Sequence, residues 1–126
     1  MPRTIIATDK AGRTRSPLSQ AVKVGNLVFV SGTTGYTTDG RIARGDFAAQ
    51  MRQVMDNIKA ILEAAGSSLD RAVKMNVIMA RAADFAAMNE VYARHIGDAP
   101  PARATVEVEK LPSGALVEIE AVALAG

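Results

Sequence analysis

Hydrophobic and polar positions along the chain recur with two different periods, which predict where helices and strands form. From residue 47 the apolar residues recur at steps of three and four, which is typical of one face of a long helix. These positions are Phe47, Met51, Val54, Ile58, Ile61, Leu62 and Ala65. Asp46 is a predicted N-cap and Gly66 a predicted C′ residue, so the sequence marks both ends of this helix.

A second, shorter helix is predicted between Asp84, a candidate N-cap, and Gly97. Its apolar positions again follow helical spacing, at Phe85, Met88, Val91, Tyr92 and Ile96. The segment Ala99-Pro100-Pro101 that follows requires an extended backbone, so the helix has to end before it.

The strands are predicted from β-prone runs and from alternation. Runs at 21–24 and 27–31 flank Gly25-Asn26, which favours a tight hairpin. Residues 32–45, rich in Thr and Gly, are predicted to form a loop. Later strands are predicted at 72–79, 102–109 and 116–124, the first with Val73, Met75, Val77 and Met79 on one side. The last two strands are separated by a Pro- and Gly-containing loop at 111–114.

This order predicts a single α+β domain over residues 1–126, with two helices packed on one face of a mixed sheet. Residues 1–15, within a polar segment broken by Gly12 and Pro17, are expected to form an extended lead-in. The sequence contains no internal repeat that would divide the chain further.

The last two strands also predict which residues share a face. Val117, Ile119, Ala121 and Ala123 are all apolar and are expected under the helices, with Leu116, Glu118, Glu120, Val122 and Leu124 opposite. In the preceding strand, Arg103 and Thr105 alternate with Val106 and Val108. By parity, Arg103 and Glu118 are both expected on the face away from the helices. That face is half apolar and no helix remains to cover it, so a homo-oligomer is expected.

Composition narrows the chemistry that this fold can carry. The chain has 126 residues, 48% of them hydrophobic, with no Cys, no Trp and one His. A cysteine nucleophile, a thiolate zinc site, a disulfide framework and a multi-histidine metal site are excluded by count. Any catalysis has to come from Arg, Glu, Asp, Asn, hydroxyl and backbone groups.

Charge and hydropathy disfavour nucleic acid and membranes as partners. The net charge is +2 and the basic residues are scattered, without the polybasic run expected for a nucleic-acid tail or a membrane-binding patch. No segment has the length of a signal peptide or of a spanning helix, so a soluble cytoplasmic protein is expected.

An ordered set of segments closely resembles the RidA/YjgF family of small imine and enamine deaminases. The resemblance runs over about residues 16–124, in order and with the expected spacing. Its segments are Ser19-Gln20-Ala21-Val22, 25–32, Gln50, 57–66, 84–92, Pro101-Ala102-Arg103, Leu111-Pro112 and 117–121.

The resemblance implies a chorismate-mutase-like α+β fold, assembled as a homotrimer with sites in the clefts between subunits. It also implies a 2-iminobutanoate/2-iminopropanoate deaminase-like hydrolase. Such an enzyme hydrolyses reactive 2-imino acids and enamines of the 2-aminoacrylate type to 2-oxo acids and ammonia, a form of metabolite damage control. No cofactor and no metal are expected.

By the same resemblance, Arg103 corresponds to the arginine that binds the substrate carboxylate, and Glu118 to the glutamate that positions the attacking water. A guanidinium is suited to the first role because its planar fork pairs bidentately with a carboxylate. Ser31, Gly32 and Asn89 match residues that line or support the pocket, and Thr105 stands where relatives often have Cys. Glu120 has the same facing as Glu118 and remains an alternative to it.

Two departures from the family pattern concern the substrate. Leu18 follows Pro17 where many relatives have Tyr, which removes a hydroxyl and adds an apolar wall. The loop after Ser31-Gly32 is also altered, and Tyr36 within it is a candidate to replace the lost hydroxyl. A pathway-specific enamine deaminase of the 2-aminomuconate type is therefore an alternative reading.

Alternatives from other classes are an RNA-directed member of the family, such as a ribonuclease or translation inhibitor, and a non-catalytic interaction or chaperone-like protein. One His and five dispersed aromatic residues disfavour RNA chemistry. No nucleic-acid partner is expected.

Overall fold

The computed structural model describes residues 2–126, which form six strands, two α-helices and three short 3₁₀ turns. The strands are β1 (Arg3–Ile6), β2 (Ala21–Val24), β3 (Leu27–Thr33), β4 (Ala72–Met79), β5 (Ala102–Glu107) and β6 (Val117–Leu124). The helices are α1 (Phe47–Ala64) and α2 (Phe85–His95). The 3₁₀ turns are η1 (Leu69–Arg71), η2 (Ala82–Asp84) and η3 (Pro112–Gly114).

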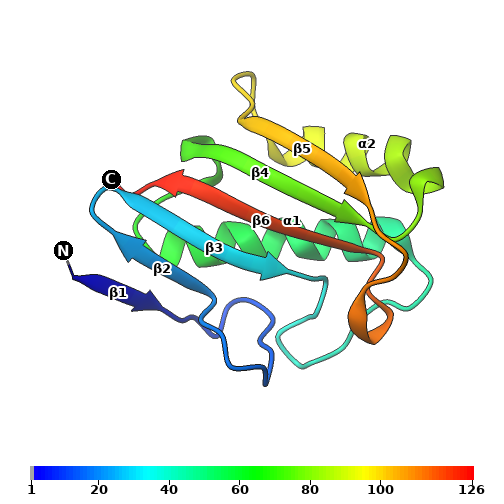
Figure 1. The fold of residues 1–126 in the computed structure, drawn as a ribbon, viewed down its shortest axis with the longest axis horizontal. Helices are drawn as coiled ribbons and strands as arrows, with labels where there is room; N and C mark the ends of the chain where they lie inside the picture. Colours follow the sequence, from blue (N-terminus) through cyan, green and yellow to red (C-terminus); the bar gives the residue numbers. More distant parts are fainter. Residues whose placement is uncertain (1) are drawn as a thin grey trace.

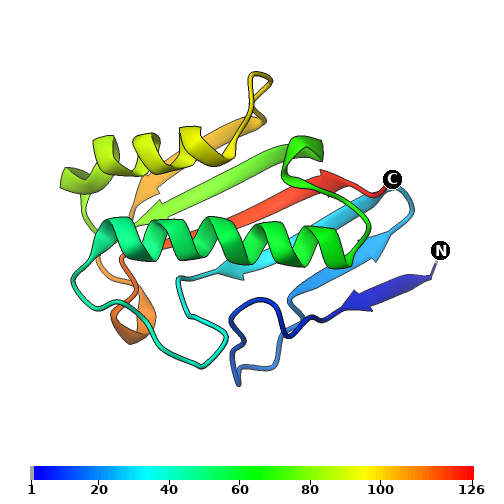
Figure 2. The same ribbon diagram turned by 180° about the vertical axis from the view of Figure 1, so that it is seen from behind.

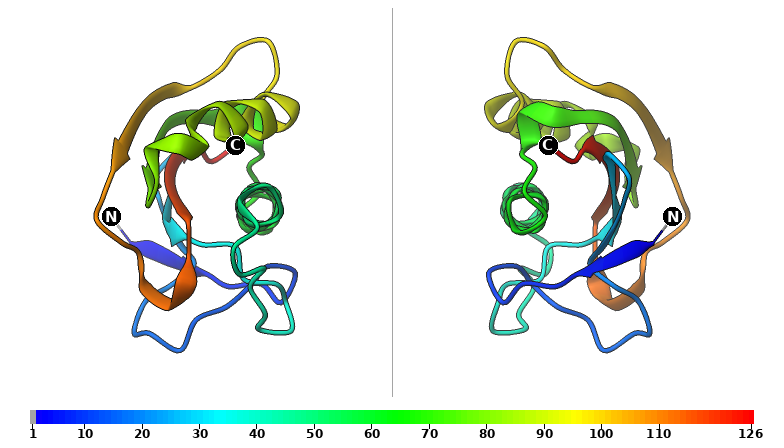
Figure 3. Two further views of the ribbon diagram at one scale, coloured as in Figure 1. Left: turned by 90° about the vertical axis from the view of Figure 1, so that its right-hand side faces the viewer. Right: turned by 90° about the vertical axis from the view of Figure 1, so that its left-hand side faces the viewer.

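The strands form one sheet in the order β1-β2-β3-β6-β4-β5 (Figure 1). Every neighbouring pair is antiparallel except β4 and β5, which run parallel and are connected through α2. Both helices lie on the same side of the sheet, as the reverse view and the end-on views show (Figures 2 and 3). The predicted α+β architecture is therefore confirmed.

Helix α1 begins and ends where its caps predict. The Asp46 side chain accepts a hydrogen bond from the amide of Ala49, and Gly66 has a φ of 79°, in the left-handed region that glycine tolerates. Its apolar stripe packs over the centre of the sheet, where Val117, Ile119, Ala121 and Ala123 of β6 are all buried, as predicted. The β2–β3 hairpin turns at Gly25, whose φ is 57°.

Four details differ from the sequence-based expectations, besides shifts of one or two residues at strand ends. The N-terminal lead-in contains β1, which pairs with β2 as an edge strand. Val73 is exposed because the register between β4 and β6 shifts at this residue. Asp84 does not cap α2 through its side chain, because its carboxylate pairs with Arg81 at 2.8 Å. The fourth difference concerns Arg103 and is described with the site.

The face of the sheet away from the helices carries an apolar stripe that crosses four strands. Cross-strand pairing places Ile5 beside Val22, Val22 beside Phe29, and Phe29 beside Val122. Ile5 and Phe29 are exposed, and neither helix covers them. This open face is the surface that the sequence predicts to be buried by another copy of the chain.

Candidate active site

A cavity of about 240 Å³ lies where the 12–20 segment, β3, the loop after it and η3 meet β6. Five residues selected from the sequence line it together: Leu18, Ser31, Gly32, Tyr36 and Glu118. Its size approaches the lower end of small-molecule sites, about 300 Å³. The sequence-based selection therefore contains a group of residues that the fold brings together.

Gly32 allows the Glu118 carboxylate to lie directly against β3. A Cβ at position 32 would come within 2.5 Å of Glu118 Oε2, so any side chain would displace the carboxylate. The β3–β6 register shifts between Val30 and Thr33, and such irregularities re-aim side chains next to functional sites. The Ser31 hydroxyl donates to the Ser19 carbonyl at 2.6 Å, so it holds the segment that carries Leu18.

Glu118 has an unusual environment for a carboxylate. Burial raises its pKa above the ordinary value of 4.5, and the negative charge of Glu120 raises the pKa further. Glu120 itself is exposed, lies outside this cavity and accepts a hydrogen bond from Asn76 at 2.8 Å. Of the two glutamates left open by the sequence, the geometry favours Glu118 as the group that meets a ligand in the cavity.

Two buried amides of α1 hold the loops that form the cavity. The Asn57 side chain accepts from the Gly12 amide at 3.1 Å and donates to the carbonyls of Thr34 and Tyr36 at 3.1 and 2.8 Å. The Gln50 side chain is also buried, and it both donates and accepts hydrogen bonds with backbone groups around η3. No role for these amides is predicted from the sequence, although their seven-residue spacing places two polar side chains on the otherwise apolar face of the helix.

Arg103 lies on the helix side of the sheet, so the expectation that it shares a face with Glu118 is wrong. The parallel register pairs Arg103 with Met75, whose side chain is buried beneath the helices. Val106, which the parity argument placed inward, is 52% exposed instead. The reason is that β5 is an edge strand beside α2, and the side chains of Asn89 and Tyr92 on α2 contact Arg103 from the helix side.

Four residues of α2 surround the Arg103 guanidinium, among them Phe85, whose ring centre lies 6.0 Å from Cζ. Its Nη1 donates to Asn89 Oδ1 at 2.7 Å and contacts Met88 Sδ at 3.6 Å. Its Cζ lies 4.9 Å from the centre of the Tyr92 ring, a cation–π distance. Arg103 forms no ion pair with Glu107, Glu118 or Glu120 in residues 2–126. The purely structural pairing that the sequence left open is therefore not found within the chain.

Two buried hydroxyls on this side of the sheet have no hydrogen-bond partner in the described part of the chain. They are the Thr105 Oγ1, two residues along β5 from Arg103, and the Tyr92 phenol, whose pKa burial raises. Buried polar groups are nearly always satisfied in a complete assembly. Thr105, Asn89 and Arg103 thus belong to a second cluster, which we call the Arg103 cluster, with open hydrogen-bonding capacity.

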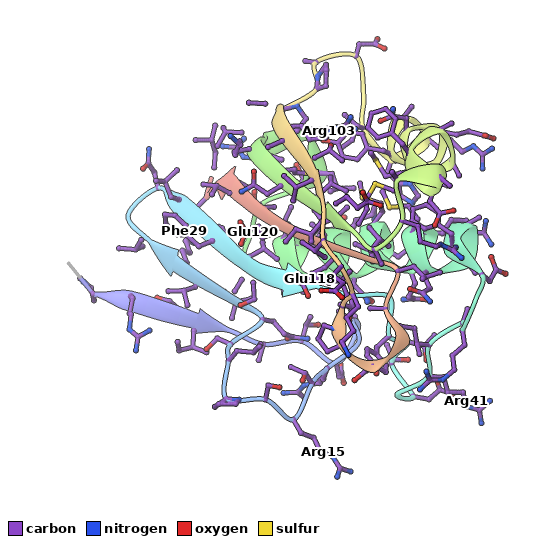
Figure 4. The ribbon with its side chains drawn as sticks, turned by 45° about the vertical axis from the view of Figure 1, so that its right-hand side comes forward. Arg15, Phe29, Arg41, Arg103, Glu118 and Glu120 are labelled. Atoms are coloured by element: carbon purple, nitrogen blue, oxygen red, sulfur yellow. The ribbon has the colours of Figure 1, made fainter. Side chains whose placement is uncertain are left out.

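The cavity and the Arg103 cluster are separate within one chain. None of the residues Arg103, Asn89 and Thr105 lines the cavity, and Arg103 and Glu118 project from opposite faces of the sheet (Figure 4). Residues 2–126 contain no group of three or more His, Cys, Asp and Glu side chains that could hold a metal ion. Over the same residues, neither helix has the length and hydropathy needed to cross a membrane.

Comparisons with known sequences find relatives along almost the whole chain. The family model described as endoribonuclease L-PSP matches residues 8–125. A RutC family protein of Pyrococcus abyssi is 47% identical over 124 residues, which is 98% of each chain. The 2-iminobutanoate/2-iminopropanoate deaminase of Mus musculus is 38% identical over 125 residues, covering 98% of this chain and 93% of the mouse protein.

Solved structures show the same fold. The crystal structure of RidA from the Antarctic bacterium Psychrobacter sp. matches with a TM-score of 0.92 and 47% identity, covering 96% of this chain and 98% of that one. E. coli TdcF with bound serine matches with a TM-score of 0.91 and 37% identity, covering 98% and 99%. The sheet order and the positions of both helices are thus shared with these proteins.

Proposed function

This chain belongs to the RidA/YjgF family, and from that premise we propose that it hydrolyses reactive 2-imino acids and their enamine tautomers to 2-oxo acids and ammonia. Named imine deaminases among its relatives support this reaction class. Within the molecule, the observation that carries the proposal is the pair of incomplete clusters. One holds a carboxylate in a cavity, and the other holds a preorganised arginine with unsatisfied hydroxyls beside it.

We place the complete site between two copies of the chain in a homotrimer. Arg103 of one copy and Glu118 of another would supply the two groups that a single copy keeps on opposite faces of its sheet. The uncovered apolar stripe, with Ile5 and Phe29 exposed, supports an assembly that buries the open face.

In this site Arg103 binds the substrate carboxylate. Asn89 accepts the hydrogen bond of Arg103 Nη1. The Nε and Nη2 atoms of Arg103 have no partner in residues 2–126 and can form a bidentate pair with a carboxylate. The Tyr92 ring restricts the guanidinium from the other side, so the fork is oriented before substrate arrives. Asn89 and Tyr92 are therefore positioning residues rather than groups that touch the substrate.

Glu118 acts on water. An enamine substrate first takes a proton from solvent at carbon, which gives the iminium form. Glu118 then takes a proton from water as the oxygen–carbon bond forms at C2, which gives a carbinolamine, and passes this proton to the nitrogen. As the carbon–nitrogen bond breaks, the remaining hydroxyl proton is released to solvent. The products are a 2-oxo acid and ammonia. Because the substrate is already unstable, orientation and one general base suffice for useful acceleration.

A coupled assay tests the activity. A dehydratase generates 2-aminoacrylate, and release of the 2-oxo acid is followed with and without this protein under conditions where spontaneous hydrolysis is measured separately. The protein is expected to accelerate the release. A rate equal to the spontaneous one, repeated with 2-iminobutanoate, would contradict the general deaminase function.

The assembly has its own test. Light scattering at micromolar concentration is expected to give about three times the 13.2 kDa mass of one chain. A charged substitution in the apolar stripe, Phe29→Asp, is expected to lower this mass and the activity together, because it breaks the intersubunit site. A monomeric mass for the active wild-type protein would rule out a site shared between copies.

Two substrate classes fit this proposal: 2-imino acids with a small uncharged substituent, and enamines of the 2-aminomuconate type. Leu18 and Tyr36 both line the cavity, which is consistent with Tyr36 supplying the hydroxyl that Leu18 lacks. An RNA-directed activity ranks below both. The single histidine, His95, lies on α2 and contacts Asp56 of α1, so the cavity contains no histidine acid–base pair.

A further inference from the structure

Arg13 stands out among the cavity residues because the proposed reaction does not use it. Arg13 and Glu118 are the charged side chains among the residues that line the cavity. Arg13 is exposed, and no carboxylate in residues 2–126 forms an ion pair with it. A cation without a partner on the wall of a small-molecule cavity is available to an anionic ligand.

No acidic side chain of its own segment offsets the charge of Arg13. Residues 10–20 contain no Asp or Glu, and the one acidic residue on the cavity wall is Glu118, which the proposed reaction already uses. Arg13 is therefore available to pair with an anionic group of a ligand, an interaction that salt screens.

We propose that Arg13 binds a second carboxylate, at the side-chain end of the substrate, so that this enzyme prefers 2-imino acids with an acidic side chain. The inference rests on the proposed deaminase function. With the first carboxylate on Arg103 of a neighbouring copy and C2 beside Glu118, the substituent on C2 enters the cavity that Arg13 lines. A guanidinium and a carboxylate form a strong, oriented pair there.

The shape and lining of the cavity fit such a substituent. At about 240 Å³ the cavity offers more room than the methyl or ethyl group of a small neutral imine would fill. Leu18, 49% exposed, provides an apolar wall suited to the methylene carbons between the two carboxylates. Arg13 is thus assigned as a specificity-determining residue, distinct from the two groups that perform the chemistry.

The test compares two imines on three proteins. Amino-acid oxidases generate 2-iminoglutarate from glutamate and 2-iminobutanoate from 2-aminobutanoate, and semicarbazide traps the imine that has not been hydrolysed. Wild type is expected to have the higher kcat/KM for 2-iminoglutarate. Arg13→Gln is expected to reduce the ratio of the two kcat/KM values by about tenfold, the effect of one lost charge-assisted contact at a partly solvated site.

Arg15→Gln is the matched control. It removes the same charge from the same segment, but Arg15 does not line the cavity and its side chain extends away from the molecule (Figure 4). In Arg15→Gln the ratio of the two kcat/KM values is expected to stay within about twofold of the wild-type ratio.

The outcomes separate the two proposals. A wild-type preference for 2-iminobutanoate, an unchanged ratio in Arg13→Gln, or an equal change in Arg15→Gln would overturn the assignment of Arg13 while the deaminase function stands. Failure of wild type to hydrolyse either imine would overturn the function and this inference with it.

Discussion

Replacing Glu118 with glutamine is expected to lower kcat for 2-iminobutanoate by about 100-fold or more, the usual contribution of a positioned general base. The glutamine side chain has nearly the same size as glutamate and fits in the same place against Gly32, but its amide cannot take a proton from water. KM is expected to change less than kcat, since Arg103 provides the main binding contact. Steady-state rates of the two proteins, corrected for spontaneous hydrolysis, give both parameters.

The pH profile identifies the group directly. Burial and the charge of Glu120 raise the pKa of Glu118, so its carboxylate is lost to protonation at a higher pH than that of an ordinary glutamate. Wild-type kcat/KM is therefore expected to fall on the acid side with an apparent pKa above 4.5, and Glu118→Gln is expected to lack this acid limb.

Glu120→Gln is the matched control for this experiment. It should retain kcat but move the acid limb to lower pH, because the neighbouring negative charge is gone. The reverse pattern, with kcat lost in Glu120→Gln and kept in Glu118→Gln, would transfer the role of general base to Glu120.

Replacing Arg103 with alanine is expected to lower kcat/KM by about 30-fold to about 1000-fold. Truncating one partner of a charged, hydrogen-bonded pair costs about 2–4 kcal/mol, and about 1.4 kcal/mol corresponds to a factor of ten. Most of the loss should appear in KM, because the substrate carboxylate is bound in the ground state as well as in the transition state. Arg103→Lys should restore only part of the activity, since it keeps the charge but not the fork.

Arg94→Ala controls for the loss of an arginine near the same helix. Arg94 is exposed on α2 and pairs with Glu90 four residues earlier, an arrangement that contributes little at a surface. Its kinetics are expected to match wild type. Equal rates in Arg103→Ala and wild type would remove Arg103 from the site, whatever the result for Glu118.

The periodic elements were predictable because their signals are local. The spacing of apolar residues along α1 and the caps at Asp46 and Gly66 depend on neighbours within a few residues, and the structure places the helix between them. Strand β1 was not recognised, because only Ile6 of its four residues is buried and its stability comes from pairing with β2, about fifteen residues away. A four-residue strand that is stabilised mainly by such pairing shows no clear alternation of hydrophobic and polar residues.

Candidate site residues were predictable one by one, but their arrangement was not. The family-like segments named Ser31, Gly32 and Glu118, departures from the family pattern named Leu18 and Tyr36, and the fold gathers all five around one cavity. The roles of Asn57 and Gln50 were not predictable, because their side-chain amides bond to loops that are distant in sequence. The place of Arg13 depends on the tertiary structure, because only the fold puts its segment on the wall of that cavity.

By itself the sequence determined the two helices, most of the strands and the family, and its lack of cysteine excluded a thiolate nucleophile. Only the tertiary structure decided that Arg103 faces α2 while Glu118 faces the opposite side of the sheet. The physical reason is that alternation along a strand states which side chains share a face, but not which face the rest of the chain covers. For the edge strand β5, packing against Asn89 and Tyr92 settled that choice.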